Sequence, residues 1–195
     1  KIEVRDFCKE LLSTLQVGNI ACVQLRLKNT PKGNMRKIIG AVLPITQDYG
    51  VPLILNDDPV VALETGCDGV HIGQEDTDYI STRKIVGRDA IVGVTCLGSI
   101  DLAMQAAERG ADYVAFGAFF PSKTKNSAGK PKLDIIKKWV EITTVPSVAI
   151  GGITAQNCNQ LVLAGADFLA VISAVWQHPK GPAAAVTEFN QVIQN

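Results

Sequence analysis

Histidine is scarce in this sequence, which has only His71 and His178. A Ser-His-Asp triad or a histidine-rich metal site therefore has little support. His71 falls inside an expected strand, which favours a structural role over that of a base. Nor does a Gly-x-Gly-x-x-Gly fingerprint follow any expected strand, and this argues against a dinucleotide-binding sheet.

Paired cysteines are also lacking. The five cysteines are odd in number and scattered, and no two form a Cys-x-x-Cys pair. This pattern argues against both a disulfide framework and a zinc site, and it is typical of a reducing compartment. We therefore expect a cytoplasmic protein.

The chain carries no net charge, because 19 basic residues balance 19 acidic ones. This excludes a global basic field that would recruit nucleic acid or an anionic membrane. No apolar run approaches the roughly 20 residues of a membrane span, and the first five residues lack the apolar core of a signal peptide. The expected partners are small-molecule substrates, with a homo-oligomer left open.

What the sequence does have is a regular alternation of strands and helices in 195 residues that are 47% hydrophobic. Apolar, β-branched runs predict buried parallel strands, and the segments between them have helical spacing, so we expect βαβ units in one domain, residues 1–195. The expected strands are Ile20–Leu27, Val51–Leu55, Gly69–Ile72, Ala90–Val94, Tyr113–Phe116, Ser147–Ile150 and Phe168–Ile172. The expected helices include Asp6–Leu15, Met35–Tyr49, Asp101–Glu108, Leu133–Glu141, Ala155–Leu163 and Ala183–Ile193, with Ser99 and Thr154 as N-caps.

A repeated joint between helix and strand favours a closed barrel. Glycine followed two residues later by aspartate precedes three expected strands, at Gly66-Cys67-Asp68, Gly110-Ala111-Asp112 and Gly165-Ala166-Asp167. Glycine can end a helix in a left-handed cap, and aspartate then turns the chain into the strand, so we assign these aspartates to stability. The fold class predicted is α/β, a TIM (β/α)8 barrel. Seven strands are visible where eight are needed, so the first is truncated, with Lys1–Val4 as a poor remnant, or missing, or the barrel is open there. A doubly wound open sheet is the less favoured alternative.

Polar residues gather where the early strands end, which is where a barrel places its chemistry. Gln24, Arg26 and Lys28 share one face of the first expected strand at a period of two. Asp57 and Asp76 follow the next two strands. Two carboxylates beside two cations suit a divalent cation that bridges to phosphate oxygens.

The later strand ends point to phosphate. Residues 117–125 place hydroxyls and lysines in a long loop, which we interpret as a lid over a phosphate. The last two strands end at Gly151-Gly152 and at Ile172-Ser173, where backbone amides can bind an anion.

Taken together, these segments resemble the thiamine-phosphate synthase (thiamine-phosphate pyrophosphorylase) family. The resemblance spans nearly the whole chain, and the His-x-Gly-Gln-Glu-Asp and Thr-Lys segments are its specific parts. The matching stretches are Gln24-x-Arg26-x-Lys28, Asn56-Asp57-Asp58, residues 69–76, Phe120-Pro121-x-x-Thr124-Lys125, residues 150–153 and residues 171–174.

The resemblance implies an Mg²⁺-dependent transferase. It would join a hydroxymethylpyrimidine diphosphate to a thiazole phosphate through a dissociative pyrimidine cation, forming thiamine phosphate and pyrophosphate. Such a reaction needs charge neutralisation and positioning but no strong base, consistent with the shortage of histidine. By position, Asp57 and Asp76 would hold Mg²⁺.

The resemblance also assigns the substrate contacts. Arg26, Lys28, Asn56 and Lys125 would bind the diphosphate, Gln24 and Thr95 would touch the pyrimidine, and Ser122 and Thr124 would lie near the substrates. Gly151, Gly152, Ile172 and Ser173 would bind the thiazole phosphate. Lys125, Arg26 and Thr95 are the expected catalytic residues.

This chain departs from the family pattern at a few positions. Thr95 and Ser122 replace the usual serine and threonine and keep their hydroxyls, while Leu97 stands where the family has His or Asn, and Ala118 where it has proline.

Three other functions share parts of this pattern. A thiazole tautomerase would need a histidine in the loop that here has Ala118. A non-catalytic paralogue that binds phosphorylated thiamine intermediates is favoured by Leu97 and opposed by Lys125 and the two aspartates. A phosphosugar isomerase or lyase would share the phosphate loops but would not predict Asp57 and Asp76 opposite Arg26 and Lys28.

Overall fold

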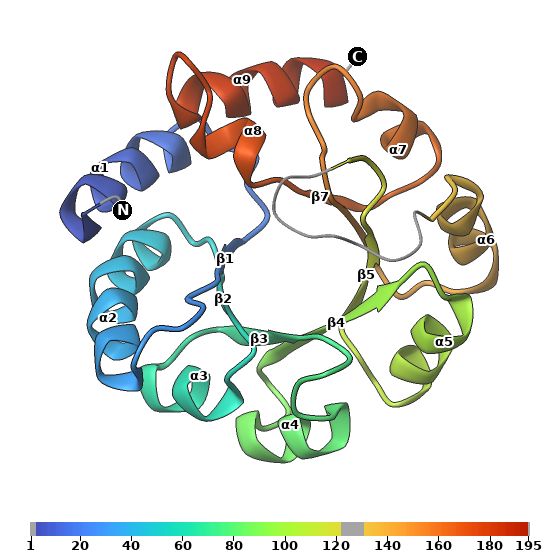
Figure 1. Cartoon of the computed structure of the whole chain (residues 1–195), viewed down its shortest axis with the longest axis horizontal. Helices are drawn as coiled ribbons and strands as arrows, with labels where there is room; N and C mark the ends of the chain where they lie inside the picture. Colours follow the sequence, from blue (N-terminus) through green and yellow to red (C-terminus); the bar gives the residue numbers. More distant parts are fainter. Residues whose placement is uncertain (1–2, 122–130, 195) are drawn as a thin grey trace. The chain divides into compact units, whose positions relative to one another are not determined.

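The computed structural model describes residues 3–121 and 131–194. The chain divides into two compact units, Lys1–Gly93 and Val94–Asn195, each an alternation of helices and parallel strands (Figure 1). The first unit contains α1 (Val4–Leu15), β1 (Val23–Leu25), α2 (Lys32–Asp48), β2 (Leu53–Asn56), α3 (Pro59–Thr65), β3 (Gly69–Ile72), α4 (Tyr79–Val86) and the start of β4 (Ile91–Leu97). The second contains the end of β4, α5 (Ile100–Glu108), β5 (Tyr113–Gly117), α6 (Asp134–Ile142), β6 (Ser147–Ile150), α7 (Asn159–Leu163), β7 (Phe168–Ala170), α8 (Ser173–Trp176) and α9 (Pro182–Ile193).

In the first unit, β1, β2 and β3 pair in parallel, with Leu25 opposite Leu55 and Asn56 opposite His71. The apolar residues of β2 are buried, as expected for a strand covered on both faces. Gly69 is required at the start of β3, because a Cβ there would overlap the backbone of Ile91.

In the second unit, β5, β6 and β7 pair in parallel, and α6 covers them with its apolar face. Trp139 of α6 is fully buried and lies edge-on to Phe116 of β5, with ring centroids 5.6 Å apart. Its indole N–H donates to the Val145 carbonyl at 2.8 Å, which satisfies the one polar atom that this residue buries.

The glycine-aspartate joints have the structural role expected of them. Gly66, Gly110 and Gly165 all have positive φ. The Asp68 carboxylate accepts from the Leu53 amide at 2.7 Å. Asp167 accepts from both the amide and the hydroxyl of Ser147, at 2.8 and 3.0 Å. Each of these two aspartates therefore ties the start of its own strand to the start of the preceding one.

The seven predicted strands are all present, and Gly69–Ile72 and Ser147–Ile150 have the predicted bounds. The first strand is shorter than predicted, because it ends at Leu25. Arg26 and Lys28 are therefore exposed residues of the following loop, and the prediction that they share a strand face with Gln24 was wrong. The last strand ends at Ala170 rather than Ile172.

Two other local predictions were also wrong. Helix α1 begins at Val4, so the Lys1–Val4 segment is not a strand remnant in its described part. Ser99 caps α5 as predicted, accepting from the Leu102 amide. Thr154 does not cap a helix, because the chain makes a turn before α7 begins at Asn159.

Within the described residues, no helix has the length and apolarity needed to cross a membrane.

Candidate active site

Two polar residues, Asn56 and Asp57, follow one another where β2 ends. Asn56 is the last residue of β2, and Asp57 continues the pairing by donating its N–H to the His71 carbonyl at 2.9 Å. Asp57 has a φ of 73°, in the left-handed region that aspartate tolerates better than most residues. The chain thus turns sharply directly after the strand.

A hydrogen-bond chain joins β1 to this turn. The Gln24 side-chain amide donates to Asn56 Oδ1 at 2.6 Å, and the Asn56 amide donates in turn to the Asp57 carboxylate. The orientation of Asn56 is therefore set from both sides. This brings together three of the residues singled out in the sequence.

Asp76 joins the cluster from the loop after β3. Its carboxylate accepts from the Gly73 amide at 2.7 Å and lies within hydrogen-bonding reach of the Asp57 carboxyl. Burial raises the pKa of Asp57, and the neighbouring charge of Asp76 raises it further. The two carboxylates repel each other and favour a proton or a cation between them.

Arg26 and Lys28 are close enough to act on the same group. Both lower the pKa of Asp57, but their effect is smaller than that of burial and Asp76, so the net direction stays upward. Burial is the largest cause of this upward pKa shift, and Asp76 adds to it.

Asp58 differs from its neighbour although it is adjacent in sequence. Its carboxylate caps α3 by accepting from the Val61 amide at 3.0 Å and pairs with Lys32 at 2.9 Å. Burial acts to raise the pKa of Asp58, but these partners lower it overall. Asp58 is thus committed to the helix.

The donor set fits magnesium. Mg²⁺ takes one or two protein carboxylates and completes its octahedron with water and substrate phosphates. Asp57 and Asp76 supply that pair of hard oxygen donors, and a divalent cation between them would offset their mutual repulsion. No group of three or more His, Cys, Asp or Glu suited to a metal occurs among residues 3–121 and 131–194, so a closed site of the zinc type has no ligands there.

The second unit contains the glycine turn that follows β6. Gly151 and Gly152 have φ values of 103° and 63°. A Cβ on Gly152 would come within 2.5 Å of the Pro121 carbonyl oxygen, and one on Gly151 would overlap Ala118. The turn therefore packs directly against the backbone that follows β5, and only glycine fits.

Ile172 and Ser173 lie where β7 passes into α8. Ile172 is half-exposed and its carbonyl accepts from the amides of Val175 and Trp176, which closes the first turn of α8. Ser173 is the first residue of that helix. Within the described part of the chain its amide has no hydrogen-bond partner, as expected at a helix start.

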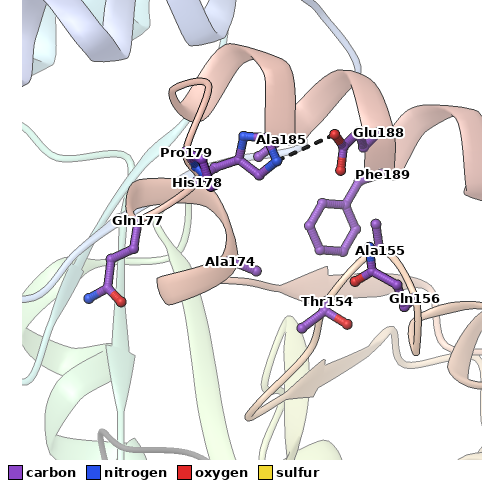
Figure 2. A pocket seen from close by; sticks show the side chains of 10 residues that line it. All are labelled: Thr154, Ala155, Gln156, Ala174, Gln177, His178, Pro179, Ala185, Glu188 and Phe189. Carbon is purple, nitrogen blue, oxygen red and sulfur yellow. Dashed lines mark ion pairs between the residues drawn. The ribbon is translucent and has the colours of Figure 1, made fainter.

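A cavity of about 190 Å³ lies behind these segments (Figure 2). The turn after β6, α8 and α9 line it: Thr154, Ala155, Gln156, Ala174, Gln177, His178, Pro179, Ala185, Glu188 and Phe189. Across its rim, His178 Nε2 pairs with Glu188 at 3.3 Å, while Nδ1 accepts from the Lys180 amide at 3.2 Å. The pair ties the end of α8 to α9.

Two further residues singled out in the sequence lie on β4. Thr95 lies on β4 in the second unit and is partly buried. Leu97, at the end of β4, is exposed with a φ of 54°. Ser122, Thr124 and Lys125 fall outside the described residues.

Sequence reasoning missed Asn157. Its side-chain amide donates to the Gly152 carbonyl at 3.0 Å, and its oxygen accepts from the Thr154 amide at 2.8 Å. The signal was an asparagine shortly after a glycine pair, since asparagine side chains commonly bond nearby backbone in turns. The His178–Glu188 pair was also missed, because its two residues are ten positions apart on different elements.

Comparison with known proteins was consistent along the chain. Residues 1–175 match a family model described as thiamine monophosphate synthase. The thiamine-phosphate synthase of Rhodospirillum centenum is 53% identical over 188 residues, which cover 96% of this chain and 91% of that protein. The thiamine-phosphate synthase of Hyphomonas neptunium is 44% identical over 99% of this chain and 89% of its own.

Solved structures agree on the fold. A thiamine phosphate pyrophosphorylase from Pyrococcus furiosus superposes with a TM-score of 0.86 at 30% identity, over 100% of this chain and 90% of that one. An orotidine 5'-phosphate decarboxylase from Pyrococcus horikoshii, only 14% identical, matches with a TM-score of 0.73 over 99% of this chain and 95% of its own, which supports the fold alone.

These matches confirm the predicted TIM-barrel class and the resemblance noted in the sequence. They also favour the transferase over the tautomerase, the binding paralogue and the phosphosugar enzyme. The chain belongs to the thiamine-phosphate synthase family.

Proposed function

We propose that the chain condenses hydroxymethylpyrimidine diphosphate with thiazole phosphate in a reaction that depends on Mg²⁺. The observation that carries this proposal is the Asp57–Asp76 pair, whose carboxyls lie within hydrogen-bonding reach of each other, with Arg26 and Lys28 close enough to act on Asp57. A site with two close carboxylates and two basic side chains suits a metal-bound diphosphate. The carboxylates would bind the metal cation, and the basic side chains would neutralise the diphosphate.

The first-unit cluster is the proposed diphosphate site. Asp57 and Asp76 would hold Mg²⁺, which when bound would neutralise negative charge on the leaving pyrophosphate. Arg26, Lys28 and Lys125 would bind the diphosphate oxygens, and the Asn56 amide would contribute a further polar contact. Gln24 already holds Asn56 in place, so it would both orient Asn56 and lie beside the pyrimidine.

The reaction needs little from the protein besides charge and position. Loss of pyrophosphate breaks the bond between carbon and oxygen and leaves a cationic pyrimidine carbon, which the thiazole nitrogen then attacks. Arg26 and Lys125 would stabilise the departing charge, and Thr95 would help to orient the pyrimidine. Ser122 and Thr124 would lie close to the substrates.

The second-unit segments are the proposed thiazole-phosphate site. Only glycine fits at positions 151 and 152 of the turn after β6, and Ser173 is the first residue of α8. Backbone amides and the Ser173 hydroxyl would bind the phosphate, with Ile172 contributing through its backbone. A cytoplasmic location belongs to the same proposal, supported by five free cysteines.

The test measures pyrophosphate release by Asp57→Ala and Lys125→Ala with both substrates and Mg²⁺. Both variants should lose turnover while keeping the far-ultraviolet circular dichroism of the parent. The matched control is Asp58→Asn, because Asp58 caps α3 and should not reach the metal. Near-normal rates in either alanine variant would overturn the site assignment.

A further inference from the structure

One side chain, that of Asn157, bridges the glycine turn after β6. Asn157 donates to the Gly152 carbonyl at 3.0 Å and accepts from the Thr154 amide at 2.8 Å, so it bridges both ends of the turn. The backbone amide of Asn157 also donates to the Thr154 carbonyl at 3.1 Å. Three hydrogen bonds therefore connect this residue to the turn.

The turn also packs against the backbone that follows β5, where the Phe120 amide donates to the Gly151 carbonyl at 3.0 Å. Two successive glycines with positive φ have more backbone freedom than any other pair of residues. After the turn, Thr154 and Ala155 line the 190 Å³ cavity (Figure 2). The Asn157 side chain fixes the Gly152 carbonyl, which the bond between Phe120 and Gly151 does not hold.

The bond to Gly152 has a consequence for anion binding. A peptide group is planar, and its carbonyl and N–H point in opposite directions. Holding the Gly152 carbonyl on Asn157 therefore fixes the direction of the next amide, that of Ile153. It also prevents the carbonyl oxygen from turning toward a bound anion, which it would repel.

We propose that Asn157 is a positioning residue for the phosphate of the second substrate. It sets the Gly151-Gly152 turn in its anion-binding form without touching the phosphate itself. This inference rests on the proposed function, since it assumes that the turn binds thiazole phosphate.

The experiment compares steady-state kinetics of Asn157→Ala and Asn157→Asp with the parent, varying each substrate in turn. Alanine removes both side-chain bonds, whereas aspartate can still accept from the Thr154 amide but cannot donate to Gly152. Both should raise KM for thiazole phosphate by roughly tenfold or more, as expected when one or two hydrogen bonds are lost. KM for the pyrimidine diphosphate and kcat at saturating thiazole phosphate should stay within about twofold.

The chain offers a matched control in Asn159→Ala. Asn159 is exposed and two residues further along, at the start of α7, and its removal should leave both KM values unchanged. The melting temperature of each variant reports whether the fold is intact.

The outcomes separate this inference from the proposed function. An unchanged KM for thiazole phosphate in Asn157→Asp would overturn the inference. A rise in both KM values together with a fall in kcat by the same factor would also overturn it. If Asn157→Ala does not fold, the aspartate variant decides the question alone. If the parent shows no turnover, the proposed function fails, and calorimetric binding of thiazole phosphate to parent and Asn157→Asp tests the inference without it.

Discussion

Replacing Asp76 with asparagine should make the metal-free protein more stable. Asparagine keeps an oxygen that can accept from the Gly73 amide but removes the charge that faces Asp57. Two unit charges about 4 Å apart interact by about 1 kcal/mol in water and by more in a protein. Since Asp57 is only partly buried and Arg26 and Lys28 act against the repulsion, we take the low end, about 0.5–1 kcal/mol. For a chain of this size that raises Tm by about 1–4 °C.

Magnesium should reverse the order of the two proteins. At ten times its Kd, a ligand bound only by the folded parent stabilises it by about 1.4 kcal/mol, which raises Tm by about 3–6 °C. Asp76→Asn loses one of the two proposed ligands and should show little of this shift. The variant is then the more stable protein in chelator and the less stable one in Mg²⁺.

The pH dependence follows from the direction of the shift. The pKa of Asp57 is raised in the folded state, so the folded protein holds this proton more tightly than the unfolded chain. Stability from this group is present at low pH and is lost as pH rises through the folded pKa. The advantage of Asp76→Asn in chelator should therefore grow as pH rises above the ordinary Asp57 pKa of 3.8.

The assay is thermal unfolding by circular dichroism, in chelator and in Mg²⁺, at several pH values. Asp58→Asn is the control, because the pKa of Asp58 is lowered by its Val61 and Lys32 partners despite burial. Its charge stabilises the fold above its ordinary pKa near 3.8, so the variant should lose up to about 1 kcal/mol and keep the Mg²⁺ shift. A metal-free Asp76→Asn less stable than the parent, or an undiminished Mg²⁺ shift, would refute the reasoning.

Three further predictions concern the fold. Asp167→Ala removes the acceptor for two groups of the fully buried Ser147 and should lower the free energy of unfolding by about 2–4 kcal/mol in urea denaturation; a loss below 1 kcal/mol would contradict the strand-tying role. Gly40→Ala, in open space within α2, should raise the free energy of unfolding by about 0.5–1 kcal/mol. Gly69→Ala should lower it by more than about 2 kcal/mol, because its Cβ overlaps the Ile91 backbone. Equal effects of the two variants would contradict the packing at Gly69. Cys96 is fully buried, and burial raises the pKa of its thiol to about 12, so it should resist a thiol reagent at pH 8 until the protein is unfolded; rapid labelling of the folded protein would disagree with this environment.

The fold was largely readable from the sequence, because buried parallel strands form apolar runs with few alternatives. Gly69–Ile72 and Ser147–Ile150 matched to the residue for that reason. The error at Arg26 and Lys28 came from extending an alternating pattern past the end of β1. Where a strand stops depends on its pairing with β2, which ends at Leu25 opposite Leu55, and the sequence does not state such pairing.

The candidate site was only partly readable. Asp57 and Asp76 were chosen because they follow adjacent strands, and the structure places their carboxyls together. That Asp58 has a different role from Asp57 could be recognised only from its helix cap and its pair with Lys32. Asn157 was overlooked because its role depends on two hydrogen bonds to backbone atoms. A polar residue at this position of the sequence does not by itself indicate those bonds.

The most direct test of the central claim is pyrophosphate release by the folded parent protein, with hydroxymethylpyrimidine diphosphate, thiazole phosphate and Mg²⁺ supplied together and each omitted in turn. We predict release only when all three are present, accompanied by an equal amount of thiamine phosphate. No release from the complete mixture, or release that continues undiminished when Mg²⁺ is replaced by chelator, would contradict the account.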